Sequence, residues 1–116
     1  MKQKLITALQ AFGYPVFLQG TMNPDATFPD TFITFWTDYT ADGLHFDNAV
    51  RSVEWSFSVI LYSNDPVIVN TKPDEIRTTL KAEGFIPQGK GQDVASGEAT
   101  HTGWAMDYII TEEMRY

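Results

Sequence analysis

The stretch of sequence that decides the fold is residues 50–62, VRSVEWSFSVILY. Apolar side chains occupy every second position in it, which is the period of a half-buried β-strand; they are Val53, Trp55, Phe57, Val59 and Leu61. Such a strand cannot stand alone, because burying one face offsets less than the entropy lost on ordering its backbone. We therefore expect this strand to have neighbours on both edges and a layer packed on its Trp55 face.

The segment before residue 14 has the spacing of a helix. Apolar residues recur three, four and seven positions apart at Leu5, Ala8, Leu9 and Phe12, and Gly13 follows as a stop signal. This predicts a helix over residues 2–12 with one apolar stripe.

Two further strands are expected before the long one. Residues 15–18 (PVFL) form a short strand, and residues 32–36 (FITFW) form one with apolar side chains on both faces. The proline-rich segment 20–30 is expected to be a long loop, and residues 39–48 to turn the chain.

After the long strand, Asn64-Asp65-Pro66 is a helix-start signal, with a capping side chain and a proline in the first turn. Pro73 would remove a hydrogen bond inside a continuous helix. We therefore expect a short turn at 66–71 and a separate helix at 73–83 that ends at Gly84.

The remaining chain adds a short strand at 85–88, a glycine-rich loop at 89–103 and a last strand marked by Trp104, Met106, Tyr108 and Ile110. The order α-β-β-β-α-β-β predicts one α+β domain over residues 1–116. Its sheet should be mainly antiparallel, with both helices packed on one face.

This arrangement leaves apolar residues pointing away from the expected core: Ile33, Phe35, Ile60, Tyr62 and Ile109. Two short helices cannot cover both faces of a sheet. The second face is therefore a candidate oligomer interface, most economically with another copy of the chain. The alternative is that loops 20–31 and 89–103 cover it.

The amino-acid composition excludes several classes of functional site. The chain has 116 residues, a formal net charge of −7 and no cysteine, which excludes disulfides, thiolate nucleophiles and cysteine zinc sites. No run of apolar residues is long enough to span a membrane, and we expect a soluble, intracellular protein.

No Lys or Arg lies between Lys4 and Arg51, where five aspartates lie. Sequence-independent binding of nucleic acid is therefore not expected. The acidic surface is either simply solvated, or meets a basic protein partner, or lets DNA pass without sticking. The candidate partner or lumen residues in the loops are Asp25, Asp30, Asp42, Asp47, Lys90, Asp93 and His101.

Catalytic signals are weak. His45 with Asp42 and Asp47, and His101 with Asp93 and Glu98, have no recognised metal spacing. A hydrolase triad of Ser96, His101 and Asp93 lacks a nucleophile elbow, and Gly89-Lys90-Gly91 lacks the phosphate-loop spacing. We expect no enzyme activity, metal or cofactor.

Several stretches together resemble a known family. They are FGYPVFLQG at 12–20, FPDTFITFW at 28–36, YSNDP at 62–66, LKAEGF at 80–85, GKGQDV at 89–94 and THTG at 100–103. Together they span nearly the whole chain, and their order is more specific than any one of them. They resemble the tail completion proteins (tail terminator, head-tail joining) of siphophages and prophages of Gram-positive bacteria.

The resemblance implies a structural role without catalysis. Copies would assemble, as a hexameric ring, to cap the tail tube and join it to the head connector, and DNA would pass without specific binding. The protein would then be found in the virion neck, and in the host cytoplasm during assembly. The alternative from another class is a small binding or inhibitor module that presents acidic loops to a basic protein. The family implies no catalytic residues.

Overall fold

The computed structural model describes residues 1–18, 29–42, 45–46, 49–50, 52–95 and 100–113. Its two helices are α1 (Lys2–Gln10) and α2 (Pro66–Ala82). Its strands are β1 (Val16–Leu18), β2 (Thr31–Asp42), β3 (His45–Phe46), β4 (Ala49–Val50), β5 (Ser52–Ser63), β6 (Ile86–Pro87), β7 (Gln92–Ala95) and β8 (Thr102–Glu113). The protein is an α+β domain with a mostly antiparallel sheet.

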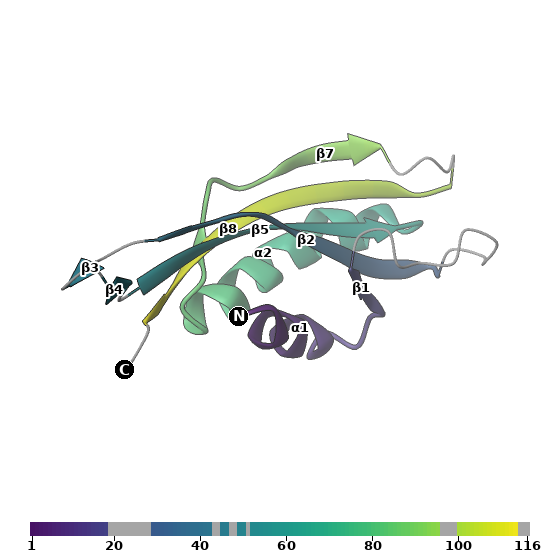
Figure 1. Ribbon diagram of the computed structural model, residues 1–116. Helices are drawn as coiled ribbons and strands as arrows, with labels where there is room; N and C mark the ends of the chain where they lie inside the picture. The colour runs from purple at the N-terminus through teal and green to yellow at the C-terminus, as the bar shows by residue number, and fades with distance from the viewer. Residues whose placement is uncertain (19–28, 43–44, 47–48, 51, 96–99, 114–116) are drawn as a thin grey trace.

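Strand β5 lies at the centre of the sheet, whose order is β1-β2-β5-β8-β6 with β7 also paired to β8. The pairings of β5 with β2 and with β8 are both antiparallel and run almost the full length of the strands. Strand β1 is the exception, since it pairs with β2 in parallel. Strands β3 and β4 form a separate hairpin beyond the end of the sheet (Figure 1).

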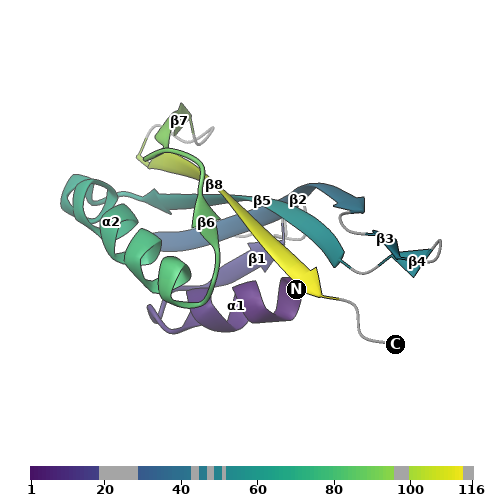
Figure 2. The same cartoon turned by 90° about the vertical axis from the view of Figure 1, so that its left-hand side faces the viewer.

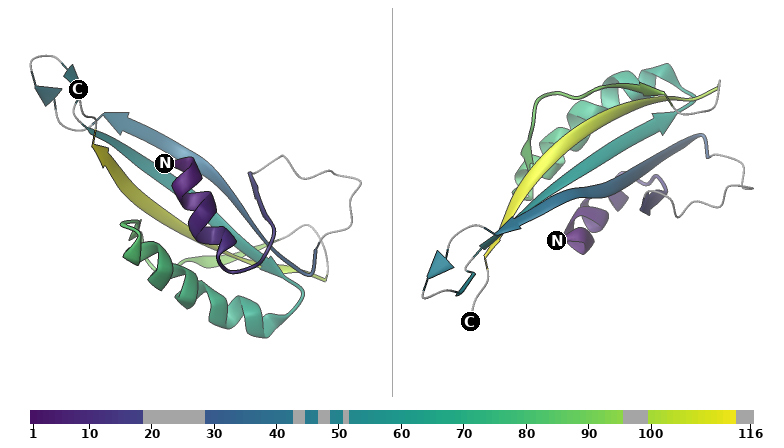
Figure 3. Two further views of the ribbon diagram at one scale, coloured as in Figure 1. Left: turned by 90° about the horizontal axis from the view of Figure 1, so that it is seen from below. Right: turned by 45° about the horizontal axis from the view of Figure 1, so that its top comes forward.

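Both helices lie against the same side of the sheet, in front of it in the left panel of Figure 3 and behind it in the right panel. They bury Leu5 and Leu9 from α1, and Ile76 and Leu80 from α2. These side chains join one core with the inward residues of the three long strands: Ile33, Phe35, Phe57, Val59, Leu61, Met106, Tyr108 and Ile110. The inward side expected for Phe57, Val59 and Leu61 is confirmed, but β5 is not half-buried at its centre, since Ser56, Ser58 and Ile60 on its other face are buried as well.

The first helix matches its expected stripe. Leu5 and Leu9 are fully buried, Ala8 and Phe12 pack partly against the core, and Gly13 takes a positive φ of 81° just beyond the helix. A residue with a Cβ would be strained in that conformation, so the expected stop at glycine is confirmed.

The second helix differs from expectation. It is one helix from Pro66 to Ala82 that continues through Pro73, and not a turn followed by a separate helix. Asp65 caps it by accepting a hydrogen bond from the amide of Val67 at 3.0 Å. Pro73 is itself buried. Packing on both sides of the proline therefore outweighs its local cost, which is about 3 kcal/mol in an isolated helix.

Two loop assignments were also wrong in part. Strand β2 extends to Asp42, through a region expected to turn, and β7 lies inside the expected loop 89–103. Neither of the two helices is both long and apolar enough to cross a membrane, as far as the described residues extend.

Tyr108 is the largest fully buried side chain, and its hydroxyl donates a hydrogen bond to Sδ of Met106 at 3.3 Å. Burial raises the pKa of Tyr108 above its ordinary value, and the positive charge of Arg77 offsets part of that rise. The folded state therefore keeps this phenol neutral at pH values where the unfolded chain ionises it. Its contribution to stability is full below about pH 10 and falls as the pH rises further.

We predict that Tyr108→Phe will flatten the alkaline loss of stability. The variant keeps the ring in the core but has no proton to lose. Free energies of unfolding from urea titrations at about pH 8 and about pH 11 should differ less for the variant than for the wild type. Equal losses in both proteins would show that another group controls the alkaline limb.

Candidate functional site

The side of the sheet away from the helices, here called the outer face, is the candidate site. Directly paired residues share a face, so the strand registers identify its members as Phe32, Thr34, Trp36, Tyr39, Ala41, Ser52, Glu54, Ser56, Ser58, Ile60, Tyr62, Ile86, Gly103, Ala105, Asp107, Ile109, Thr111 and Glu113. No helix of the described residues lies on this face. Strand β7 lies on this side of the sheet, and Figure 2 shows it above the plane of β5 and β8.

Between β6 and β7 the chain turns onto the outer face, because its pairing register with β8 changes there. Pro87 pairs with Tyr108, and Gln92 pairs with Ala105. The segment from β6 to β7 therefore advances by five residues where β8 advances by only three. The extra residues include Gly89 and Gly91, whose φ angles are 87° and 102°. Positive φ values are natural for glycine and allow the sharp bend.

Contacts with β8 hold this bend in place. The indole Nε1 of Trp104 donates a hydrogen bond to the carbonyl of Lys90 at 2.8 Å. Gly91 lies so close to the carbonyl of Ala105 and to the Trp104 ring that a Cβ would have no room. The bend is therefore fixed both by conformation and by close packing.

Between the β6–β7 segment and the sheet lies a groove of about 410 Å³. Its walls combine apolar and amide side chains with glycine backbone, and two polar side chains of the sheet reach into it. The lining residues are Trp36, Ser58, Ile60, Gln88, Gly89, Gly91, Gln92, Val94, Ala105 and Asp107. A concave site of this mixed character suits a polar or charged group carried on an apolar stem.

A β-bulge brings a carboxylate, that of Asp38, to Ser58, which lines the groove. The pairing of β2 with β5 shifts between Thr37 and Tyr39, which leaves Asp38 as the extra residue. Side chains that would otherwise alternate are re-aimed at a bulge. Asp38 accepts hydrogen bonds from Ser56 at 3.3 Å and from Nε1 of Trp36 at 2.8 Å.

Ser58 lies between two carboxylates. Its Oγ is 2.9 and 2.8 Å from the two carboxylate oxygens of Asp38 and 2.7 Å from Oδ1 of Asp107. A hydroxyl has one proton to donate, so it can satisfy only one of the two carboxylates at a time. Ser58 is buried, whereas both aspartates are exposed.

At the other end of the outer face, aromatic rings cover the sheet. Phe32 stacks on Tyr62 with ring centroids 5.1 Å apart and meets Phe17 edge-on at 6.2 Å. Gly103 lies beneath Tyr62 and Val94, with no space for a side chain of its own. Burial raises the pKa of Tyr62. This end of the face is closed by packing, and the groove opens beside it.

The expected interface residues divide into two groups. Ile60, Tyr62 and Ile109 do lie on the outer face. Ile33 and Phe35 do not: they are 0% and 2% exposed in the helix-covered core, paired with Leu61 and Val59. The expected side for these two was wrong because residues 32–36 are apolar on both faces, which leaves the register open.

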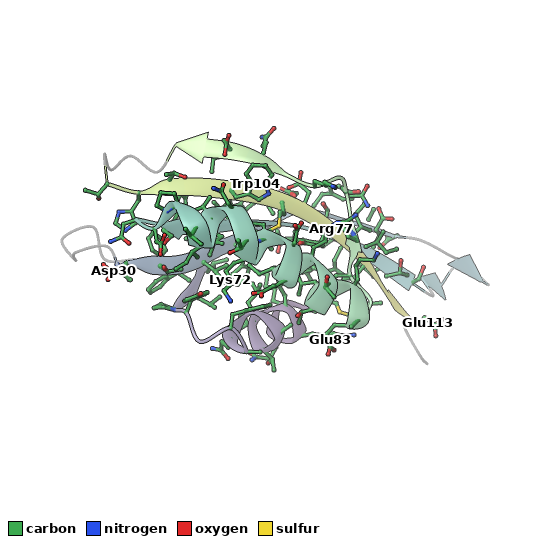
Figure 4. The ribbon with its side chains drawn as sticks, turned by 180° about the vertical axis from the view of Figure 1, so that it is seen from behind. Asp30, Lys72, Arg77, Glu83, Trp104 and Glu113 are labelled. Carbon is green, nitrogen blue, oxygen red and sulfur yellow. The ribbon has the colours of Figure 1, made fainter. Side chains whose placement is uncertain are left out.

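The structure describes only some of the expected loop residues, and among these Asp30 lies near His101, which bonds to the neighbouring Pro29. Asp25 and Asp47 lie outside the described residues, and Asp42, Lys90 and Asp93 are exposed. Asp30 accepts a hydrogen bond from Nδ2 of Asn64 at 3.0 Å and lies at the opposite end of the molecule from Glu113 (Figure 4).

His101 ties two segments together. Its Nε2 bonds to the carbonyl of Pro29 at 2.8 Å, and its Nδ1 to the hydroxyl of Thr100 at 2.9 Å. Because a carbonyl can only accept, Nε2 carries a proton and donates it to Pro29, whereas the Thr100 hydroxyl can serve either as donor or as acceptor to Nδ1. The ring also lies 6.2 Å from that of Phe32, so its contacts hold the segment before β2 against β8.

The structure describes only part of the residues that were considered for metal binding and hydrolysis. Ser96 and Glu98 lie outside the described residues, as does the side chain of His45. Within the described part of the chain, no three His, Asp or Glu side chains are placed to share a metal ion. The glycines of Gly89-Lys90-Gly91 serve the bend beside β8.

Sequence reasoning missed the groove itself. Ser56 and Ser58, which alternate with the apolar Trp55, Phe57 and Val59 of β5, are the local signal that the outer face has a polar centre. Asp38 and Asp107 are distant in sequence and meet only through the pairing of β5 with both neighbours.

Comparison with known proteins assigns no family: no protein-family model matches the chain, and no curated protein matches it significantly.

We predict that Gly91→Ala will destabilise the protein more than Gly89→Ala. Both changes strain a positive φ, which costs about 1–2 kcal/mol, but only at Gly91 would the new Cβ collide with neighbouring atoms. Denaturant titrations of the two variants give the comparison. Amide hydrogen exchange of β7 should also accelerate in Gly91→Ala, and equal stability losses would contradict the close packing described here.

Proposed function

We propose that this protein is a structural component of a phage or prophage neck. Copies assemble into a hexameric ring that caps the tail tube and joins it to the head connector. It acts in the virion, after assembly in the host cytoplasm, and carries out no catalysis. The resemblance of its sequence to tail completion proteins supplies the role, and the outer face supplies a surface suited to it.

The observation that carries the proposal is the apolar character of the outer face. Tyr39 and Ile86 are 46% and 59% exposed there, and Trp36, Tyr62 and Ile109 are half-buried. Apolar side chains gathered on a face that no described helix covers favour a protein contact.

The free edges at the ends of β2 and β8 do not favour contact through added strands. In the described chain, β2 beyond Phe35 and β8 beyond Ile109 each have one edge without a partner strand. The exposed ends of these strands carry Asp42 and Glu113. Like charges on free edges oppose edge-to-edge pairing.

The end of the sheet that carries Asp42 and Glu113 would suit a channel through which DNA passes. Strands β2, β5 and β8 extend beyond the helices as an arm (Figure 1). Its acidic side chains repel phosphate, so DNA could pass it without specific binding.

The second candidate is a binding module for a basic protein. The exposed carboxylates of Asp107, which lines the groove, and of Asp38, which also contacts Ser58, favour it. It predicts a salt-sensitive complex with a host protein and no association with tail tubes or connectors.

We predict that the purified protein will form rings on tail tubes. The test mixes it with tubes assembled from the tail-tube protein of the same phage or prophage, and examines the tube ends by electron microscopy. Native mass spectrometry of the free protein gives the copy number. Bare tube ends at saturating protein would reject the proposed role, whatever the free protein does.

A further inference from the structure

The groove on the outer face brings two negative charges close together. The carboxylates of Asp38 and Asp107 both lie within hydrogen-bond distance of Oγ of Ser58, which has one proton to donate. Like charges at such a distance repel each other unless a cation lies beside them. In the described chain neither carboxylate forms an ion pair, so this repulsion is not offset there.

The basic residues of the described chain do not supply that cation. None of the residues that line the groove is basic. Lys90 lies at the bend before β7 and is exposed. The other described basic residues lie on the helices, on the far side of the sheet (Figure 2). They are mixed there with acidic residues on and beside α2, so the helices offer no basic patch that matches the groove: Asp65, Asp74, Glu75 and Glu83.

A buried hydroxyl beside the groove also lacks a partner. Thr34 pairs with Ile60 and lies two positions from Trp36, and both of these residues line the groove. Thr34 is only 7% exposed, and its Oγ1 has no hydrogen-bond partner in the described chain. A buried polar atom without a partner is unfavourable. A guest that carries several N–H donors could give this hydroxyl a partner as well as the carboxylates.

The walls of the groove favour a guanidinium group. The indole of Trp36 lines the groove, and its N–H bond to Asp38 at 2.8 Å holds the ring beside that carboxylate. A guanidinium is planar, has five N–H donors and stacks on aromatic rings, so it can bond to two carboxylates and rest against an indole. A volume of about 410 Å³ is within the range of ligand sites.

The row of residues next to the two carboxylates is mostly apolar. Tyr39, Ser56, Ile109 and Ile86 are paired in turn across β2, β5, β8 and β6. Tyr39 and Ile86 are exposed, and Ile109 is half-buried. A free cation would leave these side chains uncovered, whereas a protein segment can cover them with the residues that flank its own cation.

We infer that the groove binds an arginine side chain of another protein, whose guanidinium lies at Asp38 and Asp107. Apolar residues on either side of that arginine cover Tyr39, Ile86 and Ile109. The inference rests on the second candidate function, to which it adds a site and a side chain.

The test uses the whole protein and two blocked peptides. One is acetyl-Gly-Leu-Arg-Leu-Gly-amide, and the other has citrulline, the uncharged isostere of arginine, in the central position. Amide NMR titrations follow the indole N–H of Trp36 and the backbone N–H of Gln92 and Ala105. The arginine peptide should shift these signals and bind at least about tenfold more tightly than the citrulline peptide, because only arginine makes charge-assisted hydrogen bonds.

Three variants locate the site. Asp107→Asn should bind the arginine peptide at least about threefold more weakly than wild type, and Asp38→Asn with Asp107→Asn at least about tenfold more weakly. Glu54→Gln is the matched control, since it removes one negative charge from the same face but does not line the groove. Its affinity should stay within about twofold of wild type. Circular dichroism and thermal melts establish that each variant folds.

Three results would overturn the inference: groove signals that do not move at about 10 mM arginine peptide, equal binding of the citrulline peptide, or equal weakening by Glu54→Gln and Asp107→Asn. The second candidate function is tested separately. Arginine binding in the groove without any salt-sensitive complex with a host protein would reject that candidate and leave the site intact. A host complex that the double variant leaves unchanged would do the reverse.

Discussion

The register of β5 between β2 and β8 is the constraint on which the rest of the structure depends. Paired residues share a face, so these two ladders decide which side chains enter the core and which form the outer face. The alternate residues Phe57, Val59 and Leu61 hold both helices. The residues between them, Ser58 and Ile60 included, are left for the opposite side, where, among the described residues, β7 and its bend cover part of the sheet.

Much of the fold was readable because it follows from local patterns. The inward side of Phe57, Val59 and Leu61, the stripe of Leu5 and Leu9, and a cap at Asn64 or Asp65 each depend on neighbours within a few positions. All three are confirmed, with Asp65 as the capping residue. The path of α2 through Pro73 was not readable, since the cost of a proline is local but the packing that outweighs it is not. The side taken by Ile33 and Phe35 depends on cross-strand register, about which a segment apolar on both faces says nothing.

The candidate site was harder to predict from the sequence than the fold, because it depends on pairing between strands that are distant in sequence. An aspartate at position 38 looks like any other acidic residue of the first half, and only the bulge in β2 brings it to Ser58. Asp107 arrives there through β8, from a distant part of the chain. The sequence did indicate a second apolar face and an acidic surface. The structure adds that Asp38 and Asp107 lie on that same face and meet at Ser58.

The late position of β8 in the chain bears on how the protein folds. Its ladder with β5 joins residues as close as Ser63 with Thr102 and as distant as Ser52 with Glu113. Contacts of such separation form slowly, because the loop between them must first be ordered. During synthesis β2 can pair with β5 at once, but the other edge of β5 has no partner until the last strand leaves the ribosome. In that interval the central strand exposes an apolar edge, which is where premature association of unfinished chains would begin.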